Sequence, residues 1–128
     1  MPIPVVEKDK ASPEQRANYL EVLLLTKQGL NSTYDALRAR RSYAGAEESA
    51  FIDELIRLNQ AEYLKVDAEE KAYLSRNVRF APPSDDDVKK IKRIVKAIDG
   101  ILAATTKAQD IMKSTTRVLN EWHKTRPA

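Results

Sequence analysis

The side chains best suited to chemistry in this sequence are one histidine and several carboxylates. His123 is the only histidine of the 128-residue chain. A general base needs an orienting partner and a metal ion needs further ligands. Glu121 is two residues away and therefore points to another side of a helix. A surface histidine near the negative end of a helix is the simpler interpretation of His123.

Adjacent carboxylates occur at Glu47-Glu48, Asp53-Glu54 and Glu69-Glu70. Helical bundles that hold two metal ions combine glutamates with Glu-x-x-His motifs, and the sequence contains no such motif. Glu62 and Glu70 approach the predicted apolar face of their helix only at its margin, where long side chains can reach water. The chain has no cysteine, which excludes thiolate catalysis and cysteine-bound zinc. We therefore expect no enzymatic activity, metal site or cofactor.

A basic cluster is the strongest charged feature of the sequence. Its members are Lys89, Lys90, Lys92, Arg93 and Lys96. All except Lys90 fall on one helix face, opposite an apolar stripe, and this face could contact phosphates. Aromatic side chains for base stacking and short polar side chains for base edges are not interleaved with them. A solvated face, partly balanced by the acidic segment 46–76, is the preferred interpretation, and anion binding is the alternative.

The first predicted helix spans residues 13–43. Ser12, Pro13 and Gln15 form a capping box with proline at the first helical position. Apolar residues then recur at steps of three and four, namely Leu20, Leu23, Leu24, Leu30, Tyr34 and Leu37. We expect this helix to continue past Gly29, although a kink there is an alternative.

The second predicted helix spans residues 46–76. It follows Gly45 and has two glutamates in its positive first turn. Its apolar face consists of Ile52, Leu55, Ile56, Tyr63, Val66, Tyr73 and Leu74. Pro82 and Pro83 then mark a linker, because consecutive prolines cannot continue a helix.

The third predicted helix spans residues 85–123, with Ser84 as its cap. Its apolar series rotates around the helix faster than a heptad pattern would, so a kink near Gly100 is an alternative, and kinks near Gly29 and Gly100 would give four or five helices in all. An unbroken third helix would be longer than the other two by about 10 to 15 Å. The overhang would carry Val118, Leu119 and Trp122, which must fold back or pack against another chain.

The predicted fold class is therefore all-α, an antiparallel up-down-up bundle of three long helices. Residues 1–11, with prolines at positions 2 and 4, are predicted to form an extended arm, and residues 12–124 a single domain. The sequence has no secretory signal and no run of about 18 apolar residues, which favours a cytoplasmic protein without a membrane span.

The leading functional hypothesis is a non-enzymatic helical interaction module, such as an adaptor, assembly factor, inhibitor or secretion-related accessory. Off-stripe or overhanging apolar residues are its candidate partner-binding residues: Val22, Leu25, Val118, Leu119 and Trp122. A protein partner is expected, and self-association is one form of this hypothesis. The alternative is binding of nucleic acid or another anionic surface through Lys89, Lys92, Arg93 and Lys96. A net charge of +3 is too small to indicate such a partner by itself.

Overall fold

The computed structural model describes residues 5–102 and 108–124, and four helices account for most of this part of the chain. The helices are α1 (Pro13–Arg41), α2 (Ala46–Ser75), α3 (Asp85–Leu102) and α4 (Ala108–His123). Two short strands, β1 (Val6–Glu7) and β2 (Arg79–Phe80), accompany them. The predicted all-α class is confirmed. None of the described helices combines the length and the apolar character that crossing a bilayer requires.

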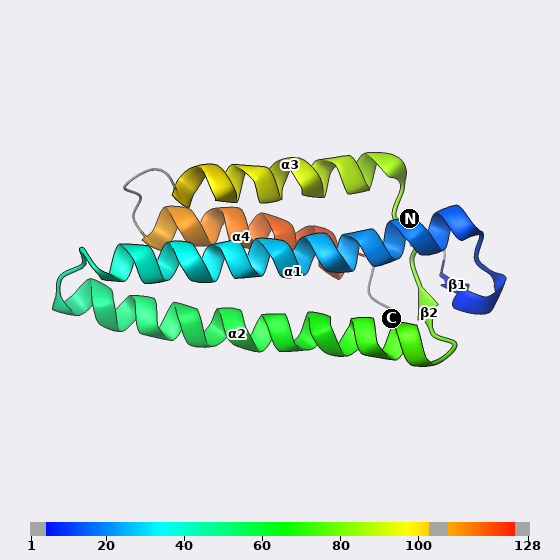
Figure 1. The fold of residues 1–128 in the computed structure, drawn as a ribbon, viewed down its shortest axis with the longest axis horizontal. Coiled ribbons are helices and arrows are strands. Elements are labelled where there is room, and N and C mark those ends of the chain that lie inside the picture. Colours follow the sequence, from blue (N-terminus) through cyan, green and yellow to red (C-terminus); the bar gives the residue numbers. More distant parts are fainter. Residues whose placement is uncertain (1–4, 103–107, 125–128) are drawn as a thin grey trace.

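Helix α1 lies at the centre of the bundle. It separates α2 on one side from α3 on the other, α4 packs beside it, and consecutive helices run in opposite directions (Figure 1). Val22 packs in a cluster with Val88 and Val95 of α3, whereas its neighbour Leu23 packs with Val66 of α2. The sides of α1 that carry Val22 and Leu23 are therefore both covered, which explains why Val22 lies off the main apolar stripe.

The capping box at the start of α1 is confirmed. The Ser12 hydroxyl accepts a hydrogen bond from the Gln15 N–H, and the Gln15 side chain accepts one from the Ser12 N–H, both at 3.0 Å. The helix then runs without interruption past Gly29, so this glycine does not divide it into two helices. Ser32, within α1, faces α3. Its hydroxyl donates to the Asp99 carboxylate of α3 at 2.7 Å.

The prediction of one continuous helix over 85–123 is wrong, and with it the three-helix bundle. Helix α3 ends at Leu102, α4 begins at Ala108, and the two helices pack against each other. Residues 103–107, which connect them, lie outside the described residues. The break also comes after Gly100, which still lies within α3. The position of the apolar residues shifts around the helix between the first and second halves of 85–123. Two separate helices can each turn their own apolar side towards α1, whereas one straight helix could not.

The N-terminal arm is attached to the end of the bundle. Strand β1 pairs antiparallel with β2, with Val6 opposite Phe80. A 3-10 turn follows, in which the Lys8 ammonium donates hydrogen bonds to the carbonyls of Tyr73 and Arg76 at the end of α2. Only part of the predicted arm is thus extended. Its contacts fix the linker after α2 against the helices.

Candidate interaction surfaces

The predicted partner-binding residues do not form an open face. Val22, Val118 and Trp122 are fully buried, at 0% exposure, while Leu25 and Leu119 are half-buried. This corrects the expectation of an apolar surface. The physical reason is that α4 packs along α1. Val118 and Trp122 of α4 are therefore buried against the bundle, and Val22 of α1 is covered by residues of α3 and α4.

Trp122 takes part in a core cluster that joins three helices and the linker. Its neighbours there include Tyr19, Leu23, Tyr73 and Phe80. Within this cluster the ring centroids of Tyr19 and Phe80 lie 4.4 Å apart, and those of Tyr19 and Tyr73 lie 5.0 Å apart. The overhang predicted from the sequence is therefore an anchor of α4 in the fold.

The exposed large apolar side chains lie elsewhere. In the described part of the chain they are Leu24, Tyr43, Phe51, Leu58, Leu64 and Leu74. The last four belong to α2, an edge helix that packs mainly against α1. Leu24 and Leu74 were assigned to core stripes by periodicity, and their exposures of 52% and 62% contradict that assignment.

Phe51 and Leu58 share one side of α2. They are seven residues apart, which is about two helical turns, and are 47% and 45% exposed. Ile52 and Leu55, which adjoin them, are buried against α1 and α4 residues. The two exposed side chains thus border the core face of the helix. We call this pair the α2 row. Sequence reasoning missed it because an apolar residue near a stripe is normally expected to be buried.

All four bases of the predicted anion-binding face are exposed on α3. The Lys92 ammonium forms an ion pair with Glu21 of α1 at 2.8 Å. Lys90, on another side of the helix, pairs with the buried carboxylate of Glu121 at 2.8 Å. The structure therefore separates Lys90 from the face of the other four, as the helical spacing predicted.

The predicted balance between acidic helix 46–76 and the basic cluster is wrong. The two helices lie on opposite sides of α1 (Figure 1). The acids of α2 instead meet the bases of α1. Arg40 Nε lies 2.8 Å from Glu48, and Arg41 Nε lies 2.7 Å from Asp53. Sequence net charges could not reveal this, because they do not tell which helices become neighbours.

Lys27 forms the central ion pairs between α1 and α2. Its ammonium lies 2.9 Å from Asp67 and 3.3 Å from Glu70, with 17% of the side chain exposed. The hydrogen bond with Asp67 raises the pKa of Lys27 above its ordinary value. Lys71 and Lys27 together lower the pKa of Asp67. Lys27 therefore stays charged at neutral pH, as an ion-pairing residue and not as a nucleophile.

The remaining titratable candidates form no catalytic pair. His123 is exposed, and its ring lies against Trp122 with 4.9 Å between centroids. Glu121 bonds to Lys90 and Lys124; burial alone would raise its pKa, but the two ammonium groups outweigh burial and lower it. Glu62 pairs with Lys65. Among residues 5–102 and 108–124, no three histidine, aspartate or glutamate side chains come together as metal ligands would.

A pocket of about 370 Å³ lies between α1 and α2. Its lining is formed by Asn31, Tyr34, Asn59, Gln60, Tyr63 and Leu64, which are all uncharged. The buried Asn59 amide donates to the Leu30 carbonyl at 2.9 Å and so helps to join the two helices. The nearby Lys27 ammonium lies 5.3 Å from the centre of the Tyr63 ring but is held by its two carboxylates. This lining offers no acid and base in reach of each other.

Comparison with protein-family models, with curated proteins and with solved structures finds no match to this chain.

Proposed function

We propose that this chain is a non-enzymatic helical interaction module that binds a protein partner through the α2 row, Phe51 and Leu58. The observation that carries the proposal is the placement of two exposed large apolar side chains, Phe51 and Leu58, two turns apart on one side of α2. Single exposed apolar residues are ordinary on protein surfaces. A row beside the core of an edge helix is the arrangement that an amphipathic partner helix covers.

The spacing of the row supports a helical partner. Apolar residues seven apart meet a second helix at successive turns of a packed helix pair. Between the two row residues, Glu54 and Arg57 bond to each other on the helix surface, so this part of the rim is polar and carries no net charge. An apolar centre with a polar rim is the usual composition of a protein interface. Phe51 and Leu58 thus take the place of Val22, Val118 and Trp122 as candidate contact residues, because those three are buried.

A pair of double variants tests this proposal. Phe51→Glu with Leu58→Glu changes the row, and Leu64→Glu with Leu74→Glu makes the same change at more exposed positions elsewhere on α2. Affinity capture from the native cell, followed by identification of bound proteins, should recover a partner with the wild type and the control. The row variant should lose this partner while its circular dichroism and urea unfolding stay unchanged.

Light scattering of the three purified proteins covers the case in which the partner is a second copy. A wild-type dimer that the row variant alone converts to a monomer would support the α2 row as the contact. The proposal fails if the row variant captures the same proteins as the wild type and keeps the same molar mass. It also fails if both double variants lose the partner equally.

A further inference from the structure

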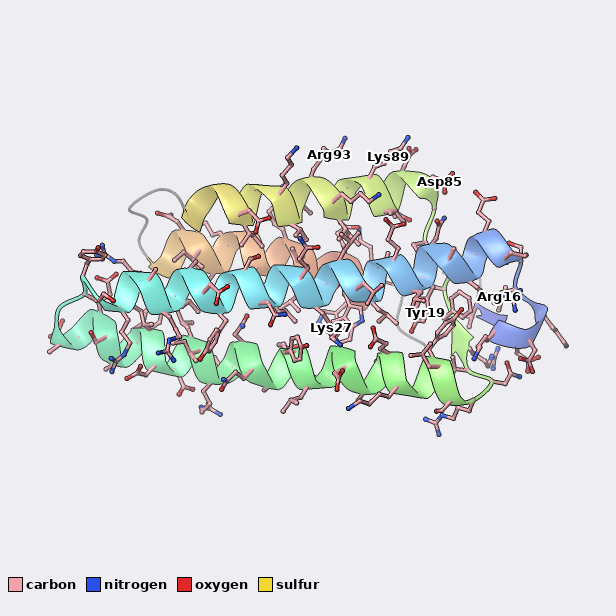
Figure 2. The ribbon with its side chains drawn as sticks, viewed as in Figure 1. Arg16, Tyr19, Lys27, Asp85, Lys89 and Arg93 are labelled. Carbon is pink, nitrogen blue, oxygen red and sulfur yellow. The ribbon has the colours of Figure 1, made fainter. Side chains whose placement is uncertain are left out.

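The open face of α3 carries positive charge that the rest of the molecule does not neutralise. Lys89, Arg93 and Lys96 are exposed, and in the described part of the chain none of them forms an ion pair. Figure 2 shows Lys89 and Arg93 extending away from the bundle. The acids of α2 lie across α1 from this face and pair with bases of α1, as Asp67 does with Lys27 and Asp53 with Arg41.

The charge is arranged as a narrow row. Positions 89, 93 and 96 are separated by steps of four and three, so they lie on one side of α3 over about 10 Å of helix. Asp85 and Asp86 lie at the start of the helix, and Glu21 of α1 borders the row through its bond with Lys92. Figure 2 places Asp85 next to Lys89 along the same edge. The positive charge is thus bounded by carboxylates at one end and on one side.

This shape favours a linear polyanion over a flat anionic surface. A membrane would meet the bordering carboxylates together with the lysines, whereas a phosphate chain can follow the row and avoid them. Among residues 85–100 of α3, no large apolar side chain is exposed, so this stretch has no group to insert into lipid or to stack on an unpaired base. Lysine and arginine alone are suited to the phosphates of a duplex.

We propose that the α3 row, Lys89, Arg93 and Lys96, binds the phosphate backbone of double-stranded DNA without reading its sequence. The 2′-hydroxyls that distinguish RNA duplexes need polar partners such as asparagine or serine, and the row contains none. Lys92, at the edge of the row, remains bonded to Glu21. This surface lies across α1 from the α2 row, so the inference is independent of the proposed protein partner.

The salt dependence of binding is the sharpest measurement. Three phosphate contacts predict a slope of about −2.7 for the logarithm of the affinity against the logarithm of salt concentration. Fluorescence anisotropy with a labelled, mixed-sequence DNA duplex at neutral pH measures this slope. The triple variant Lys89→Glu, Arg93→Glu, Lys96→Glu should lose at least about tenfold in affinity at low salt.

A second triple variant distinguishes the effect of the α3 row from the effect of the protein's net charge. Arg57→Glu, Lys65→Glu, Arg76→Glu changes the charge equally along and just after α2, at exposed bases. The ion pairs of Arg57 with Glu54 and of Lys65 with Glu62 are local surface pairs of little energetic weight. At about 0.1 M salt this variant should stay within about threefold of the wild-type affinity, because charges farther away than the Debye length of about 10 Å are then largely screened. Replacement of the three row residues by glutamine provides a milder version that should reduce the slope towards zero. Circular dichroism checks the fold of every variant.

Several outcomes would overturn the proposal. One is the absence of duplex binding by the wild type at low salt, and another is equal loss of affinity in both triple variants. Binding to vesicles of phosphatidylserine and phosphatidylcholine through the row, without binding to DNA, would identify a membrane surface instead. Tighter binding to single-stranded DNA or to an RNA duplex of the same sequence would likewise contradict duplex DNA as the ligand.

Discussion

Gly29 allows three helices to approach closely at the middle of the bundle. A methyl group at this position would lie 3.3 Å from a Val95 methyl of α3 and 3.4 Å from a Val118 methyl of α4. One turn later, the hydroxyls of Thr33 and Thr115 are in contact, linking α1 to α4. Gly29 is therefore kept small by tertiary packing and not by a local turn. Gly100 differs, because nothing lies near its missing side chain.

Alanine substitutions at Gly29 and Gly100 should change the free energy of unfolding in opposite directions. Alanine is favoured over glycine in a helix by about 1 kcal/mol, so Gly100→Ala should stabilise the protein by up to that amount. At position 29 crowding of the two valines, about 1 to 3 kcal/mol, should exceed the same gain, and Gly29→Ala should destabilise. Urea unfolding measures both. Equal stabilisation by the two substitutions would contradict the close packing at Gly29.

At the scale of an element, α4 is held by its buried side. Ile111, Val118 and Trp122 are spaced seven and four residues apart, and each is at most 2% exposed. The buried Glu121 adds an ion pair with Lys90 of α3. The sequence alone left two destinations for these apolar residues, its own bundle or another chain. Contact with α1 and α3 places them within the bundle.

The fluorescence of Trp122 should report this packing directly, because it is the only tryptophan of the chain. Its native emission should be blue-shifted and poorly quenched by iodide, and both properties should change on unfolding in urea. Trp122→Ala should cost about 3 to 5 kcal/mol of stability, as expected for a large buried aromatic residue. Leu74→Ala, at an exposed position, should stay within about 0.5 kcal/mol. Native quenching equal to that of the unfolded chain would show α4 to be unpacked.

At the scale of the whole molecule, the N-terminal arm connects the start of the chain to the end of α2. The last turn of α2 contains no basic residue of its own. Lys8 supplies the positive charge there, with its ammonium 4.9 Å from the centre of the Tyr73 ring and bonded to helix carbonyls. A cation at this end of a helix interacts favourably with the helix dipole.

Two neighbouring lysines test the role of the arm. Lys8→Ala should reduce the free energy of unfolding by about 1 kcal/mol, because it removes the charge and the hydrogen bonds from the end of α2. Lys10 is exposed and pairs only with nearby Glu7, so Lys10→Ala should change stability by less than about 0.5 kcal/mol. Chemical denaturation of both variants gives the comparison. If both substitutions changed the free energy of unfolding equally, the contact of Lys8 with the end of α2 would contribute nothing specific to stability.

The sequence by itself determined the features that depend on near neighbours in the chain. Ser12 with Gln15 set the start of α1, and Ser84 with Asp87 set the start of α3 through reciprocal bonds of 3.0 and 3.1 Å. The prolines at 82 and 83 interrupted the helices as expected. Caps and proline effects act within a few residues, so periodicity and capping rules can locate them. The basic face of α3 could also be located from the sequence, because it depends only on the spacing of residues along one helix.

Tertiary structure alone decided which faces meet. Whether Trp122 protrudes or is buried depends on how α4 packs, and here it lies against α1 and α3. Whether Leu74 is buried depends on how far the neighbouring helix covers α2. The pairing of acids and bases likewise follows from the central position of α1, since charge attraction acts between neighbours in space. These choices depend on the free energy of packing the whole bundle, which no local pattern in the sequence contains.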